Sequence, residues 1–358
     1  MNADALSNLL DPAVLFFLLG LLAGAVRSNL EIPPQVAKFL SLYLLVAIGF
    51  KGGQELSSTG LGVEGLKVLG IALLLAVVVP ALGFLVLRKK VDQLDAAAIA
   101  ATYGSVSAVT FVAASNFVAS NGDPAGGYLT VSLVLMESPA IIMAVVLASW
   151  VRQRRSEVTS PARAGAATGA AVPPTGADGS TMLEVEAEAE APAAPFSARS
   201  VLHEALTNGA NLLLLGSLAI GFLSGAKGGE AMAPFTSGIF KGLLAFFLLE
   251  MGLLVARQLR EVRDVGPFLV GFGLVMPLVA ASLALLLGSL AGLNVGDLTV
   301  LTVLAASASY IVVPAVVRFA IPEARPSRYL TMALAVTFPF NIVVGIPLYY
   351  AVAQQLAG

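Results

Sequence analysis

The chain has 358 residues, of which 58% are apolar and 12% charged, with a formal net charge of −2. Soluble domains contain about 45 to 50% apolar and about 25% charged residues, so this composition excludes an ordinary soluble protein and predicts one embedded in a lipid bilayer. The near-neutral charge gives no indication of a nucleic-acid partner. With no cysteine and a single histidine, His203, disulfides and thiolate chemistry are excluded and no metal site is expected.

Apolar stretches separated by narrow bands of charge predict an all-α polytopic protein with ten transmembrane helices. The first stretch is interpreted as a span and not as a signal peptide, because Asp4 and Asp11 flank it in place of a basic region. The predicted spans cover residues 13–27, 37–56, 63–88, 94–119, 126–151, 202–224, 234–259, 265–292, 296–318 and 328–353.

A stretch of different composition separates the fifth and sixth spans. Residues 156–198 contain small residues, Pro173-Pro174 and the alternating acidic run Glu184 to Glu190. Because few large apolar side chains occur there, we predict a disordered linker between a first five-helix repeat, residues 1–155, and a second, residues 199–358. The acidic run is either a docking segment for a basic partner or a solvated spacer, and the spacer is favoured.

Lysine and arginine residues gather on one side of the membrane when the ten spans are drawn. The positive-inside rule then places the 156–198 linker in the cytoplasm and both termini in the periplasm of a bacterial inner membrane. His203 falls at the cytoplasmic end of the sixth span, where a solvated interfacial role is expected. The basic residues on the cytoplasmic side are Arg27, Lys38, Arg88, Lys89, Lys90, Arg152, Arg154, Arg155, Arg257, Arg260, Arg263, Arg318, Arg325 and Arg328.

The two halves align with each other at three positions. Since each half has an odd number of spans, the second half enters the membrane from the opposite side, which predicts a 5+5 inverted repeat typical of secondary transporters. The aligned pairs are Gly49 with Gly252, Ser105-Val-Ser107 with Ser307-Ala-Ser309, and Pro139 with Pro339.

Runs of small and hydroxyl residues fall at matching places in the fourth and ninth spans. Gly104-Ser105-Val106-Ser107 and Ser307-Ala308-Ser309-Tyr310 predict two broken helices that cross near the midplane and bind substrate. A helix that begins after a break presents unpaired N–H groups and a partial positive charge, which favours a small anion. No buried lysine or arginine is expected close to either break. The alternative is serines that bond back within unbroken helices, which the pairing disfavours.

Two carboxylates, Glu137 and Glu250, lie deep in predicted spans. Intramembrane acids are costly and are candidates for cation binding or proton transfer. Glu137 is the stronger candidate, and we assign it to ion coupling with Thr110 and with Asn341, which follows the equivalent proline of the second half. For Glu250 a helix–helix hydrogen bond is equally expected. No ATP-binding loop and no catalytic constellation is visible, so we predict neither an enzyme nor a cofactor.

Several segments resemble the cyanobacterial high-affinity sodium-dependent bicarbonate transporters and their relatives in other bacteria. The resemblance implies a ten-span inverted repeat divided into a core and a gate domain, a homotrimer, and substrate and sodium held at the two breaks. It also implies a PII-like, nucleotide-binding regulatory trimer at the cytoplasmic face. The matching segments are Ile48-Gly-Phe-Lys-Gly-Gly53, Tyr103-Gly-Ser-Val-Ser-Ala-Val-Thr110, Met136-Glu-Ser-Pro139, and Ser307-Ala-Ser309 with Pro322-Glu-Ala-Arg-Pro-Ser327.

The second break departs from the pattern of the family. The cyanobacterial proteins have Ser-Ser-Ser-Asp there, whereas this chain has Ser307-Ala-Ser309-Tyr310, and Glu137 stands where the family has Asp. We therefore predict import of bicarbonate or a similar small anion by cation-coupled symport, with sodium as the coupling ion and a proton as the alternative. A cation-coupled organic anion carrier, an exporter and a non-transporting membrane sensor remain alternative interpretations.

Overall fold

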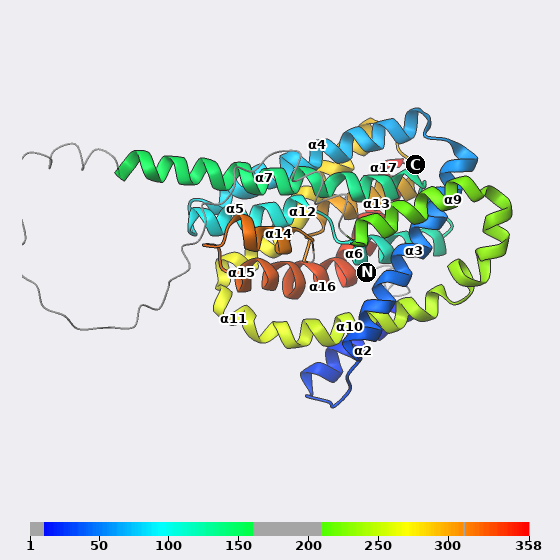
Figure 1. Cartoon of the computed structure of the whole chain (residues 1–358), viewed down its shortest axis with the longest axis horizontal. Helices are drawn as coiled ribbons and strands as arrows, with labels where there is room; N and C mark the ends of the chain where they lie inside the picture. Colours follow the sequence, from blue (N-terminus) through cyan, green and yellow to red (C-terminus); the bar gives the residue numbers. More distant parts are fainter. Residues whose placement is uncertain (1–10, 160–208, 311, 358) are drawn as a thin grey trace, which may run out of the picture.

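The computed structural model describes residues 11–159, 209–310 and 312–357, and within these ranges every regular element is helical (Figure 1). Seven helices are long and apolar enough to cross a membrane, so the chain is an all-α polytopic membrane protein. The exact number of ten spans stays a prediction. His203 and residues 160–198 of the predicted linker lie outside the described residues, and the helix before the linker continues to Thr159.

The helices follow the predicted spans closely, and prolines begin several of them because the first turn of a helix needs no backbone donor. The first half contains α2 (Pro12–Ala25), α3 (Pro34–Thr59), α4 (Gly62–Leu87), α5 (Gln93–Gly104), α6 (Ala108–Ser120) and α7 (Tyr128–Thr159). The second half contains α9 (Gly209–Ala233), α10 (Phe240–Gln258), α11 (Val262–Val265), α12 (Pro267–Leu290), α13 (Val295–Ala306), α14 (Val312–Ala320), α15 (Pro326–Thr331), α16 (Phe338–Phe340) and α17 (Ile346–Ala357).

The apolar run from Gly209 to Val265 is 57 residues long, and it folds back on itself. A continuous helix of that length would extend for about 85 Å, whereas the hydrocarbon core of a bilayer is about 30 Å thick. The run bends at Gly225, whose φ of 55° and ψ of −152° are not helical, and again at the π-helical turn Pro234–Gly238. The first bend lies within α9 and the second separates α9 from α10, so the chain turns back on itself, as Figure 1 shows.

Two helix pairs, α3 with α9 and α2 with α10, pack backbone against backbone. A Cβ atom on Gly49 would lie 2.6 Å from the carbonyl oxygen of Leu214, and one on Gly252 would lie 2.2 Å from that of Phe17. Small residues allow such close approach in membranes, where the hydrophobic effect does not drive helices together. The two glycines that align between the halves therefore make equivalent contacts in the two pairs.

The helices α2, α3, α9 and α10 pack mainly on one another and form a panel, while α4 to α7 and α12 to α17 form a separate bundle. The panel occupies the right and lower parts of Figure 1. Panel and bundle meet along a seam, where α3 faces α6 and α7 and where α9 faces α7. This seam contains the cavities described below.

Two buried aspartates fix the broken helices inside the bundle. Asp95, in the first turn of α5, accepts a hydrogen bond from the Arg325 N–H at 2.8 Å and pairs with the Arg328 guanidinium at 2.8 Å. Asp297, in the first turn of α13, accepts from the Gly126 N–H at 2.7 Å. Each carboxylate thus ties the start of one broken helix to the loop that follows the other.

Candidate functional site

The first predicted break is an interruption between α5 and α6. Gly104 is the last residue of α5, and Ser105 and Ser107 have extended backbones, with φ of −102° at both positions. The Ser107 hydroxyl accepts a hydrogen bond from the Thr110 N–H at 3.2 Å, so it caps the amino end of α6. Residues 105–107 are therefore outside the helices, as the sequence predicts.

The second break repeats this arrangement between α13 and α14. Ser307 follows Ala306, the last residue of α13, with φ of −85° and ψ of 169°. The Ser309 hydroxyl accepts a longer hydrogen bond, 3.4 Å, from the Val313 N–H in the first turn of α14. Hydroxyl groups thus face the amino ends of both helices that begin after a break.

The two breaks touch each other and satisfy part of each other's backbone. The Ser107 N–H donates to the Ser307 hydroxyl at 3.0 Å, and the Ser309 N–H donates to the carbonyl oxygen of Thr102 at 2.9 Å. The Ser307 hydroxyl itself donates to the carbonyl oxygen of Leu304 at 2.8 Å. Backbone groups freed by one break are taken up by the other, which is a condition for non-helical chain at membrane depth.

A cavity of about 110 Å³ opens beside the breaks, in the seam between panel and bundle. We call it the break cavity. It brings together five of the predicted site residues: Val106, Ser107, Glu137, Ser309 and Tyr310. The remaining lining comes from Ala108, Val109 and Leu133 of the bundle and from Lys38, Ser41, Leu42, Leu45, Ala210, Asn211 and Leu214 of the panel.

Glu137 is the buried carboxylate of this cavity, with 6% of its surface exposed. It accepts a hydrogen bond from the Asn211 side chain of α9, so the contact crosses the seam from bundle to panel. Within the described part of the chain, no lysine or arginine lies within ion-pair distance of Glu137. A negative charge here has a polar partner and access to the cavity, and Lys38, which also borders the cavity, does not pair with it in the part of the chain that the structure describes.

The other predicted site residues lie behind the cavity wall. Thr110 donates its hydroxyl to that of Ser107 at 2.9 Å, and Ala308 is buried. Asn341 donates to the carbonyl oxygen of Ala306 at 2.8 Å and accepts from the Tyr349 hydroxyl, so it closes the carboxyl end of α13. These residues support the breaks and do not line the break cavity.

Ser105 differs from the other break serines. Its hydroxyl is buried and has no hydrogen-bond partner among the described residues. Buried polar groups are ordinarily hydrogen-bonded, so this hydroxyl has bonding capacity that the described protein does not use.

A family model described as the Na+-dependent bicarbonate transporter superfamily matches residues 12–354. The chain belongs to this superfamily. The match runs from α2 into α17 and contains both breaks, the break cavity and Glu137. Among curated proteins none matches the chain. Membership of a transporter superfamily indicates that this membrane protein is a transporter and not an enzyme.

Sequence reasoning missed two residues that line the break cavity of the transporter, Lys38 and Asn211. Lys38 is exposed and borders the break cavity from α3. Both residues belong to panel helices, and no spacing in the sequence indicates which bundle helix they face.

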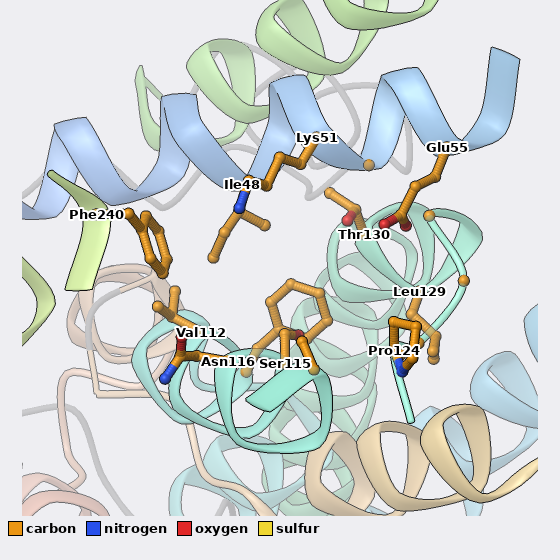
Figure 2. A pocket seen from close by; sticks show the side chains of 16 residues that line it. Ile48, Lys51, Glu55, Val112, Ser115, Asn116, Pro124, Leu129, Thr130 and Phe240 are labelled. Carbon is orange, nitrogen blue, oxygen red and sulfur yellow. The ribbon is translucent and has the colours of Figure 1, made fainter. Parts of the chain in front are cut away.

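A second cavity of the transporter, of about 140 Å³, lies along the same seam (Figure 2). We call it the Lys51 cavity. Lys51 and Glu55 extend from α3, and Figure 2 shows the Lys51 amine near Ile48 and Phe240 while the Glu55 carboxylate lies near Thr130. The other lining residues are Gly52, Phe111, Val112, Ser115, Asn116, Ala119, Pro124, Ala125, Gly126, Gly127 and Leu129.

Proposed function

We propose that the chain imports bicarbonate, or a similar small monovalent oxyanion, by cation-coupled symport with the break cavity as its binding site. The observation that carries the proposal is the meeting of Ser107, Ser309 and Glu137 in one cavity between panel and bundle. At about 110 Å³ this cavity is much smaller than the roughly 300 to 1,000 Å³ of pockets for drug-sized ligands. Its size favours bicarbonate over a larger organic anion.

The surroundings of the break cavity favour an anion. The amino ends of α6 and α14 adjoin Ser107 and Ser309, and a helix amino end attracts negative charge through its unpaired N–H groups and its dipole. Lys38 adds a positive charge at the edge of the cavity. The hydroxyl groups of the two serines supply donors and acceptors for a hydrated oxyanion.

Glu137 is the proposed coupling group, with sodium as the proposed ion. Sodium is a hard cation and prefers oxygen ligands, in common with calcium and magnesium, and the Glu137 carboxylate and the hydroxyls of Ser107 and Ser309 line one cavity. Tyr310 stands where the resembling family has an aspartate, so Glu137 would carry the negative charge of the ion site. Proton coupling through Glu137 is the alternative that the experiment below distinguishes.

We also propose that the transporter has ten spans in a 5+5 inverted repeat, with periplasmic termini and a cytoplasmic 156–198 linker. The equivalent contacts of Gly49 and Gly252 support the repeat, as do the equivalent positions of Asp95 and Asp297. The resemblance supports a homotrimer and a PII-like regulator. Protease added to intact spheroplasts should leave the linker uncut, and cleavage there would overturn the orientation.

Uptake of labelled bicarbonate into proteoliposomes tests the function, with the sodium and proton gradients imposed separately. We expect accumulation driven by an inward sodium gradient, at many substrate molecules per protein. Accumulation driven by a proton gradient alone would show that the proton, and not sodium, is the coupling ion. Binding of about one bicarbonate per protein without accumulation would overturn transport and favour a membrane sensor.

A further inference from the structure

Lys51 is a cation inside a membrane-spanning helix that no part of the proposed mechanism uses. Within the described ranges it has no ion-pair partner, although Glu55 follows one helical turn later on α3. Its amine lies 5.3 Å from the centre of the Phe240 ring on α10, and Figure 2 shows it directed along the cavity and away from Glu55. Intramembrane charges are costly and usually mark functional paths.

Besides Lys51, four polar side chains line its cavity, Glu55, Ser115, Asn116 and Thr130. Ser115 of α6 lies across the opening from α3, Asn116 of α6 lies on the same side of the cavity as Val112, and Thr130 of α7 lies beside Glu55 (Figure 2). Among the described residues, the charged groups Glu55 and Lys241 act on Lys51 electrostatically. Because Lys51 and Glu55 do not pair, a ligand between them would meet a positive charge at one end and a hydrogen-bond acceptor at the other.

The Lys51 cavity and the break cavity lie at two successive places along the same seam between panel and bundle. On α3 the seam-facing residues recur every three or four positions, as expected for one helix face. Val109 and Val112 on α6, and Leu133 and Thr130 on α7, likewise divide between the two cavities. Along α3 the break cavity takes Lys38, Ser41, Leu42 and Leu45, and the Lys51 cavity takes Ile48, Lys51, Gly52 and Glu55.

We propose that the Lys51 cavity is a second anion site, which captures the small oxyanion before it reaches the break cavity. The ammonium group of Lys51 and the amide of Asn116 would bind the charged oxygens. Side-chain oxygens of Glu55 and Thr130 would accept a hydrogen bond from the hydroxyl that distinguishes bicarbonate from fully deprotonated anions. In the proposed orientation, the carboxyl half of α3 that carries Lys51 lies toward the periplasm. This inference rests on the proposed function.

The absence of cysteine from the chain permits a direct test by substitution of Lys51→Cys. The half-saturation concentration of bicarbonate should rise at least roughly threefold in this variant, because one attractive charge is lost. Modification with 2-aminoethyl methanethiosulfonate restores a positive charge and should restore the half-saturation concentration, whereas the sulfonatoethyl reagent should raise it further. Lys51→Gln should match the unmodified cysteine variant.

The matched control is Lys67→Cys on α4, because Lys67 donates to the carbonyl oxygen of Ala291 at 2.8 Å and lies outside both cavities. Its half-saturation concentration should not respond to either reagent. An unchanged half-saturation concentration in Lys51→Cys, or equal responses to the two reagents, would overturn the capture site.

A binding measurement separates this inference from the proposed function. In detergent, bicarbonate should slow thiol labelling of Lys51→Cys but not of Lys67→Cys, and chloride should slow neither. Protection without any uptake by the unmodified chain would retain the site and reject transport. Uptake by the unmodified chain without protection would retain transport and reject the site.

Discussion

The two helix breaks have the same backbone shape but different side-chain roles. In the second break, the Ser307 hydroxyl is fully engaged, accepting from Ser107 and donating to Leu304. In the first break, the Ser105 hydroxyl at the equivalent position has no partner among the described residues. Of these two equivalent serines, Ser307 therefore holds the crossing together, whereas Ser105 keeps unused bonding capacity. Both breaks contribute residues to the break cavity, Ser107 and Ser309 among them.

The same contrast appears two residues before the aligned prolines. Glu137 precedes Pro139 and lines the break cavity. Thr337 precedes Pro339, and its hydroxyl is hydrogen-bonded to the carbonyl oxygen of Gly273 at 2.8 Å and to the Tyr103 hydroxyl at 2.6 Å. Two repeats with the same backbone can thus differ in function, with the reactive side chain present in one repeat only. The predictions below test this asymmetry between the repeats.

The largest expected effect is that of Glu137→Gln. The amide cannot carry the negative charge that a coupling cation requires, so gradient-driven uptake should fall at least about tenfold, the scale on which one charged contact acts. If protons couple, the variant should still exchange labelled for unlabelled bicarbonate, since exchange needs no net proton movement. The measurement is uptake and exchange in proteoliposomes.

Thr337→Val is the matched variant in the second repeat. It loses two structural hydrogen bonds and should lower thermal stability while uptake stays dependent on the cation gradient. Fully gradient-driven uptake by Glu137→Gln would show that this carboxylate is structural and that the asymmetry is absent.

A smaller effect is expected for Ser307→Ala. The substitution leaves the buried Ser107 N–H without its acceptor, which costs about 1 to 3 kcal/mol of folding free energy. The unfolding midpoint in detergent should fall accordingly. Equal midpoints for Ser307→Ala and Ser105→Ala would contradict the assignment of the structural role to Ser307.

The smallest effect is predicted for Ser105→Ala. Because this hydroxyl has no protein partner among the described residues, the unfolding midpoint should stay within error of the original. Ser105 does not line the break cavity in this structure, so its hydroxyl reaches substrate only after the breaks move. A hydrogen bond made then, worth about 0.5 to 1.5 kcal/mol, would make Ser105→Ala raise the half-saturation concentration about two- to tenfold. Unchanged uptake kinetics would remove Ser105 from the binding site.

The sequence was sufficient to predict the helical class and the positions of both breaks. These features depend on local composition, since small hydroxyl residues weaken a helix and apolar length sets a span. It was insufficient for Asp95 and Asp297, which resemble ordinary acidic residues in a first helical turn. Their distant partners, Arg325 and Gly126, depend on how the two halves pack.

Which residues line the break cavity also depends on how the helices pack. Glu137 and Ser309 were predicted as site residues from their types and positions, and both line the cavity. Asn341 was predicted by the same reasoning, but its amide is directed at the end of α13. Lys38 and Asn211 were missed because the seam between panel and bundle is a tertiary contact. The coupling role of any of these residues stays a prediction.

The reciprocal bonds between the breaks have a mechanical consequence. Ser107 is bonded to Ser307 and Ser309 to Thr102, so neither break can open without pulling on the other. We expect the two breaks to move together as one unit when the binding site opens alternately to the two sides of the membrane. Such a movement would carry apolar protein surface through the lipid, so each turnover would deform the bilayer. Since bilayers resist mismatch with a protein's apolar surface, the turnover rate should depend on acyl-chain length even where bicarbonate affinity does not.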